Sequence, residues 1–182
     1  MTDINTFLKC LPFETERLRI RQYRLTDLVE TLRMSQDPIL RKWTLSGVFN
    51  DEEHKEYVSK SSSDSPKDFI LEDKLTGAIV GEMTFHLWTA ERTWEIGWLV
   101  LPSCQGLGYA SEAAKKLIEI GFGTMELHRI IAKATPENKA SCRVMEKVGM
   151  RKEGLFKQCI PREDGSWWDE ICYGILAAEW KP

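Results

Sequence analysis

The sequence lacks any apolar run long enough to cross a membrane, and its N-terminus has no apolar signal-peptide core. Histidine is scarce, with three residues, too few and too scattered to indicate a zinc site. The five cysteines, at positions 10, 104, 142, 159 and 172, show no metal-type spacing. An odd, unpatterned set of cysteines is typical of reduced thiols, so we expect a cytoplasmic protein with no metal site.

A large excess of either charge is also absent, because 25 lysines and arginines face 28 aspartates and glutamates, for a net charge of −3. Nearly balanced charge argues against general binding to nucleic acid or to a membrane surface. With 42% hydrophobic and 29% charged residues, the chain has the composition of an ordinary globular protein. We therefore expect residues 1–182 to form a single domain, as a monomer or a homodimer.

The chain is organised around residues 94–122, where the pattern of a strand changes into that of a helix. Residues 96–101 are almost wholly apolar, which predicts a strand covered on both faces. Gly106 and Gly108 follow in a turn, and apolar residues then recur at helical spacing. Such a turn can bind phosphate, because the first helical turn has unpaired N–H groups. The glycines could equally serve only the geometry of the turn.

Two common phosphate-binding motifs fit this turn poorly. A P-loop needs Gly-Lys-Ser/Thr before the helix, where this chain has Tyr109-Ala110-Ser111. A dinucleotide-binding fold needs a third glycine or alanine at the position of Ser111 and an acidic residue after the next strand, where Thr135 stands. The turn fits a third pattern, Gln/Arg-x-x-Gly-x-Gly/Ala after an apolar strand, in residues 105–110.

Residues 105–110 resemble the acetyl-CoA pyrophosphate loop of the GNAT superfamily of N-acetyltransferases. Asn138-x-x-Ser141, followed by Glu-Lys-x-Gly-Met, resembles the second cofactor motif of that superfamily. The opening segment 14–21 and the Trp167-Trp168-Asp169 hairpin are similar to the branch that acetylates the N-termini of ribosomal proteins. The resemblance therefore extends over about residues 14–180. We interpret the arginines of the opening strand as a solvated face.

The resemblance implies a mixed α/β fold, the GNAT acetyltransferase fold, with a twisted mixed sheet of about seven strands and helices on both faces. A central parallel pair, at 94–101 and 127–134, should splay apart to admit pantetheine. The residue patterns predict other strands at 14–21, 68–73, 78–88, 151–160 and 167–176, a turn at 162–165, and helices at 27–35, 50–60 and 136–148.

The resemblance also implies acetyl-CoA as cosubstrate, bound without a metal. It places the cofactor along the end of the central strand, on the glycine turn and on the second motif. The cofactor-binding residues expected from it are Leu99, Val100, Leu101, Gln105, Gly106, Leu107, Gly108, Tyr109, Ala110, Asn138 and Ser141. Trp43, Phe49 and Tyr57 are candidates for the acceptor side of the cleft, and packing in a local core explains them equally well.

Acetylation of an amine requires a base that neutralises the amine and an acid that protonates the leaving thiolate. Glu95 is the candidate base, because a carboxylate on the mainly apolar central strand is costly unless it is paired or useful. Glu82 on the neighbouring strand is the rival, and a structural role is the alternative for both. Ser141 is the candidate acid by resemblance, with capping of its own helix as the alternative.

We expect an acetyl-CoA-dependent N-acetyltransferase that acts on a primary amine. The resemblance favours a protein N-terminal amine, such as that of a ribosomal protein. One alternative is a small-molecule amine acceptor, such as a polyamine or an aminoglycoside. Another is a noncatalytic acyl-CoA-binding protein, which would keep the glycine turn without needing Glu95 or Ser141.

Overall fold

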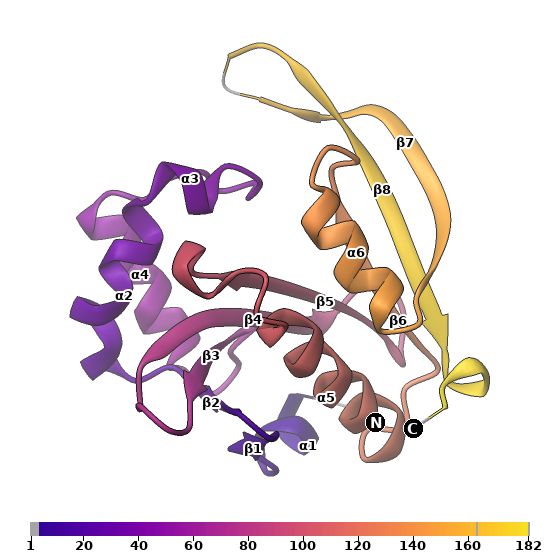
Figure 1. Ribbon diagram of the computed structural model, residues 1–182, viewed down its shortest axis with the longest axis horizontal. Coiled ribbons are helices and arrows are strands. Elements are labelled where there is room, and N and C mark those ends of the chain that lie inside the picture. The colour runs from indigo at the N-terminus through magenta and orange to yellow at the C-terminus, as the bar shows by residue number, and fades with distance from the viewer. Residues whose placement is uncertain (1–3, 163, 182) are drawn as a thin grey trace.

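The computed structural model describes residues 4–162 and 164–181, and these form a mixed sheet with helices on both of its faces (Figure 1). Its eight strands follow the order β1-β2-β3-β4-β5-β6-β8-β7. The strands are β1 Phe13–Glu14, β2 Leu18–Gln22, β3 Asp68–Asp73, β4 Ile79–Leu87, β5 Thr93–Val100, β6 Arg129–Ala134, β7 Arg151–Pro161 and β8 Trp167–Leu176. The helices are α1 Ile4–Leu8, α2 Leu28–Gln36, α3 Pro38–Arg41, α4 Asp51–Ser61, α5 Tyr109–Gly123 and α6 Lys139–Lys147.

The alternation of side chains along the strands separates two apolar layers. On β3, Phe69 and Leu71 belong to the layer that contains α5 and α6, whereas Ile70 belongs to the layer that contains α2, α3 and α4. The mixed α/β fold predicted from the sequence is therefore confirmed. The sheet has eight strands rather than about seven, because the opening segment divides into β1 and β2 around a turn.

The central parallel pair splays apart, as predicted. Strands β5 and β6 pair only from Thr93 with Arg129 to Glu95 with Ile131. Beyond that point β5 continues to Val100 and β6 to Ala134 without pairing to each other. Figure 1 shows the two strands diverging, with β6, β8 and β7 turned away from the rest of the sheet. The splay exposes a backbone edge in the middle of the sheet.

The helices before β3 differ in part from the expectation. The helix expected at 50–60 is α4, and Asn50 caps it by accepting hydrogen bonds from the N–H groups of Glu52 and Glu53. No helix was expected between residues 35 and 50, where the short helix α3 forms, capped by the side chain of Asp37. Helix α1 was not expected, because its five residues are too few to show a period; buried Phe7 fixes it to the sheet.

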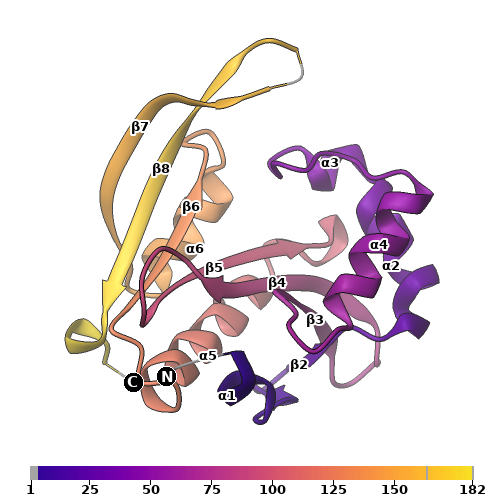
Figure 2. The ribbon, with the colours of Figure 1, turned by 180° about the vertical axis from the view of Figure 1, so that it is seen from behind.

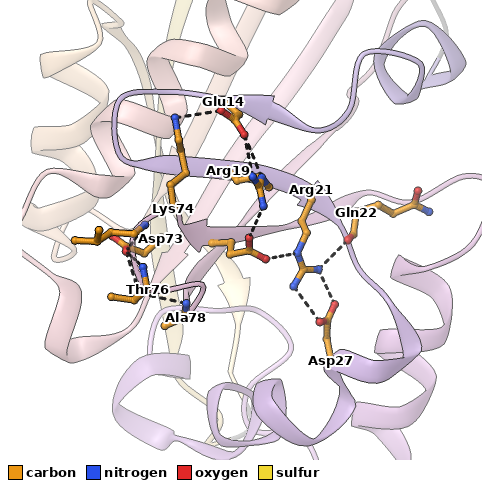
Figure 3. A network of polar contacts seen from close by, with 11 residues as sticks. Glu14, Arg19, Arg21, Gln22, Asp27, Asp73, Lys74, Thr76 and Ala78 are labelled. Carbon is orange, nitrogen blue, oxygen red and sulfur yellow. Dashed lines mark hydrogen bonds and ion pairs between the residues drawn. The ribbon is translucent and has the colours of Figure 1, made fainter.

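The arginines of β2 form ion pairs with acidic side chains. The prediction that these arginines lie on a solvated face is wrong for Arg21. Arg21 is buried, with ion pairs of 2.8 Å to both Asp27 and Glu72 (Figure 3). Arg19 joins the same network through Glu14 and Glu72, each at 3.1 Å. A buried guanidinium needs such partners, so this network fixes β2 to β3 and to the start of α2.

The hairpin of β7 and β8 extends beyond the end of β6 toward the loop after α3, as both ribbon views show (Figure 2). The rings of Trp43 and Trp168 are 5.4 Å apart, and the guanidinium of Arg162 lies 3.8 Å from the centroid of the Trp168 ring. The expected turn at 162–165 includes residue 163, which lies outside the described residues. Among the described helices, none has the length and apolar character needed to span a membrane.

Candidate active site

A cleft of about 750 Å³ lies at the splay between β5 and β6. Its walls include the end of β5, the glycine turn, the start of α6 and the α3 loop. The cofactor residues expected from the sequence that line it are Leu99, Val100, Gln105, Gly106, Gly108, Tyr109, Ala110, Asn138 and Ser141. Leu101, Leu107 and Glu95 are not among the described lining residues. One cleft thus brings together most of the predicted site.

The glycine turn presents backbone N–H groups at the start of α5. Gly108 is the N-cap of this helix and has φ of 88°, in the left-handed region that favours glycine. Within the described chain, the N–H groups of residues 106–110 form no hydrogen bond. These unpaired donors and the positive end of the helix dipole form a potential anion site.

Arg17 of the segment before β2 holds this turn in place. Its Nη1 donates to the carbonyl oxygen of Leu107 at 2.9 Å, and its Nε donates to Glu112 of α5 at 2.7 Å. The guanidinium also lies 4.6 Å from the centroid of the Tyr109 ring. Glu112 raises the pKa of Arg17, so the guanidinium stays charged beside the turn. These contacts preorganise the turn.

The end of β5 directs backbone groups toward the splay, where a ligand can reach them. The N–H of Leu101 donates to the carbonyl of Val80 on β4 at 2.9 Å. Successive strand residues direct their N–H and C=O groups to opposite edges, so those of Val100 face the splay. The carbonyl of Val100 accepts from Nε2 of Gln105 at 2.9 Å. The N–H of Val100 therefore remains available.

Ser141 lies across the splay from β5, at the start of α6. Its backbone N–H donates to Oδ1 of Asn138 at 3.2 Å, so Asn138 caps the helix. Its hydroxyl oxygen accepts a hydrogen bond from Nε1 of Trp98 at 3.1 Å. Since an indole N–H can only donate, the hydroxyl proton of Ser141 is free to be donated elsewhere. This arrangement suits a proton donor in the cleft.

The two candidate bases differ in position. Glu95 forms an ion pair of 3.3 Å with Lys133, and Lys133 rather than Glu95 lines the cleft. Glu82 lines the cleft and is 7% exposed. Tyr23 and Tyr57 donate hydrogen bonds to Oε2 of Glu82. Burial, followed by the nearby charge of Asp68, raises the pKa of Glu82 above its ordinary value of 4.5.

The acceptor-side aromatics predicted from the sequence are only partly in the cleft. Trp43 and Tyr57 line it, whereas Phe49 packs against Arg41 with the guanidinium 4.2 Å from the ring centroid. Several polar residues on this side also line the cleft without having been predicted from the sequence, among them Arg41 and Asp68. A lone aspartate at the start of an apolar strand could have signalled Asp68, but no pattern distinguishes Arg41.

Residues 17–151 match the family model described as an acetyltransferase (GNAT) domain. An uncharacterized N-acetyltransferase from Bacillus subtilis, YnaD, is 44% identical over 91% of this chain and 97% of its own length. The crystal structure of a GNAT-family acetyltransferase from Bacillus anthracis superposes with a TM-score of 0.86 at 42% identity, covering 91% of this chain and 98% of that one.

More distant matches carry specific acceptors in their names. An Escherichia coli [ribosomal protein uS5]-alanine N-acetyltransferase is 31% identical over 87 residues, which are 48% of this chain and 44% of its own length. Spermidine N-acetyltransferase from Vibrio cholerae has a TM-score of 0.78 at 20% identity over 91% of this chain and 98% of its own, a likeness of fold alone. Among the described residues, no cluster of histidine, cysteine or acidic side chains could hold a metal ion.

Proposed function

Because the chain belongs to the acetyltransferase (GNAT) family, we propose that it acetylates the N-terminal α-amine of a protein, with a ribosomal protein as the favoured acceptor. Acetyl transfer itself follows from the family. The observation that carries the choice of an amine is a pair of carboxyl groups, those of buried Glu82 and half-buried Asp68, in the same cleft as the glycine turn. A carboxylate in a partly enclosed cleft can both attract an ammonium group and take its proton.

Acetyl-CoA fits the donor half of the cleft. The N–H groups of residues 106–110 would bind the pyrophosphate, because they are unpaired at a helix N-terminus. The N–H of Val100, at the exposed edge of β5, would pair with the pantetheine. When bound, the cosubstrate supplies the thioester to which the amine adds. Asn138 supports this half by fixing the first turn of α6.

The protein residues then have two tasks in the transfer. Glu82 would accept the proton of the acceptor amine; Glu95 is the second candidate, and its ion pair with Lys133 makes it the weaker one. Ser141 would donate its hydroxyl proton to the thiolate as CoA leaves, with Trp98 fixing the hydroxyl orientation. An N-terminal α-amine has a pKa near 8, so a carboxylate of modest basicity suffices to neutralise it.

The proposal of a ribosomal-protein acceptor rests on similarity over only part of the chain. The opening segment, the Asn138-x-x-Ser141 phrase and the closing hairpin resemble that branch. The uS5-alanine N-acetyltransferase match spans less than half of either chain. A polyamine is the second candidate, because a cleft with two carboxyl groups attracts any cation and a spermidine N-acetyltransferase shares the fold.

The wild-type protein should acetylate short peptides that begin with alanine or serine with a higher kcat/KM than spermidine or an aminoglycoside. We expect a preference of about 10-fold or more, the size of one charge-assisted hydrogen bond. The measurement is CoA thiol release at matched concentrations of neutral amine, with an N-terminally blocked peptide as control. A preference for the small amines would replace the protein acceptor with a polyamine or aminoglycoside.

Replacing Ser141 by alanine should lower kcat by about 10²-fold, at the low end for an acid–base group because water can also protonate the thiolate. The KM for acetyl-CoA should change little, since the N-cap hydrogen bond to Asn138 uses the backbone of Ser141. Steady-state kinetics measure both values. Ser103→Ala is the control, because Ser103 is exposed and is not among the described lining residues. An unchanged kcat would assign the proton donation to solvent.

A further inference from the structure

The acceptor side of the cleft contains a polar cluster of Arg41, Glu82 and Asp68. The members of this cluster differ in how many of their hydrogen-bonding groups have a partner. Arg41 is 5% exposed and lines the cleft beside Glu82. Its Nη1 is 3.5 Å from Oε1 of Glu82, a weak contact for a buried pair. Its Nε and Nη2 are buried and have no hydrogen-bond partner among the described residues. An unsatisfied buried guanidinium is costly, which points to a partner supplied by a ligand.

The strand register places this cluster on the route to the splay. Asp68 of β3 lies opposite Thr84 of β4, and Thr84 lies opposite Gly97 of β5. The three residues form one row on the face that α2, α3 and α4 cover, and Gly97 at its end has no side chain. All three line the cleft. An acceptor bound at the cluster therefore has an open path to the exposed edge of β5.

We propose that this cluster is a subsite for an amine with a neighbouring carbonyl oxygen, in which Asp68 and Glu82 bind the ammonium and Arg41 donates to the oxygen. This inference rests on the proposed function and adds the residues that recognise the acceptor. It selects an α-aminoacyl group, as at a peptide N-terminus, because that group has an amine and a carbonyl two bonds apart.

The chemistry of the cluster distinguishes this acceptor from a polyamine. Two carboxylates and one guanidinium together carry one net negative charge, which a single additional cation neutralises. A polyamine brings several ammonium groups, one of which would approach Arg41, and it has no oxygen for Nε or Nη2. Phe49 and Tyr57 stack on the guanidinium at 4.2 and 5.8 Å, which holds Arg41 in one orientation.

The test compares alaninamide with 2-aminopropane, in which a methyl group replaces the carboxamide, at equal concentrations of neutral amine. The wild-type protein should favour alaninamide in kcat/KM by about 10-fold or more, the size of a hydrogen bond to a charged donor. Arg41→Gln should lose most of this preference and leave acetyl-CoA affinity unchanged. Arg33→Gln is the matched control, since Arg33 is exposed on α2 and is not among the described lining residues.

The outcomes separate this inference from the proposed function. If Arg41→Gln binds acetyl-CoA normally and keeps the full preference, Arg41 does not read the carbonyl and the inference is overturned, while acetylation of N-terminal amines stands. If the wild-type protein prefers spermidine to every peptide, both fail. Should Arg41→Gln not fold, the wild-type comparison decides alone: equal kcat/KM for alaninamide and 2-aminopropane overturns the subsite, and a preference for alaninamide supports it.

Discussion

Replacing Gly108 with leucine should weaken acetyl-CoA binding by about 100-fold or more, through the loss of two or more hydrogen bonds to phosphate. Gly108 has φ of 88°, which a leucine rarely adopts, and a Cβ there would lie 3.4 Å from Nη2 of Arg17. The substitution therefore disturbs both the turn and the arginine that holds it. The N–H groups of residues 106–110 would no longer converge on one anion.

A calorimetric titration with acetyl-CoA measures this effect. Gly77→Leu is the matched control, because Gly77 has φ of 72°, lies in the turn between β3 and β4, and is not among the described lining residues. In the control, a leucine is forced into a positive φ at a position away from the cleft, so the affinity for acetyl-CoA should stay at the wild-type value. Unchanged affinity in a folded Gly108→Leu protein would show that the turn does not bind the cosubstrate.

Replacing Glu82 with glutamine should lower kcat by about 10²–10⁴-fold, the usual effect of removing a general base. Burial, and then the charge of Asp68, raises the pKa of Glu82 above 4.5. A raised pKa makes the carboxylate a stronger base, but the base form is present only once the pH exceeds that pKa. The acidic limb of the wild-type kcat/KM profile should therefore lie above pH 4.5, and Glu82→Gln should lose that limb.

Glu95→Gln is the same change on the neighbouring strand, and it separates the two candidate bases. Because Glu95 is paired with Lys133 at 3.3 Å and does not line the cleft, we expect a loss below about 10-fold, that of a group outside proton transfer. The pH profiles of both variants with one peptide acceptor are the measurement. Near-native turnover in Glu82→Gln with a large loss in Glu95→Gln would return the role of base to Glu95.

The sequence predicts the donor half of the site well because that half is local. The almost wholly apolar run at residues 96–101 predicts a buried strand, and β5 covers Thr93–Val100. The change to helical spacing after the glycines predicts α5 and its first turn. Asn138 and Ser141 are three residues apart on one helix, so their proximity follows from the helical period.

The acceptor half could not be predicted in the same way, because its contacts join segments far apart in the chain. Arg41 ends the short helix α3, which has too few residues to show a period, and it meets Glu82 of β4 only in the folded chain. Whether Glu82 or Glu95 faces the cleft depends on strand pairing and on the position of Lys133. Periodicity predicts the face on which a side chain lies, but not its partner.

The central claim is tested most directly by a peptide that carries both an N-terminal alanine and an internal lysine. The wild-type protein and acetyl-CoA are incubated with this peptide, and tandem mass spectrometry locates the added acetyl group. The account predicts one acetyl group on the N-terminal nitrogen, with an equal amount of CoA released. Acetylation of the lysine alone, or a peptide that stays unmodified while spermidine is acetylated, would contradict it.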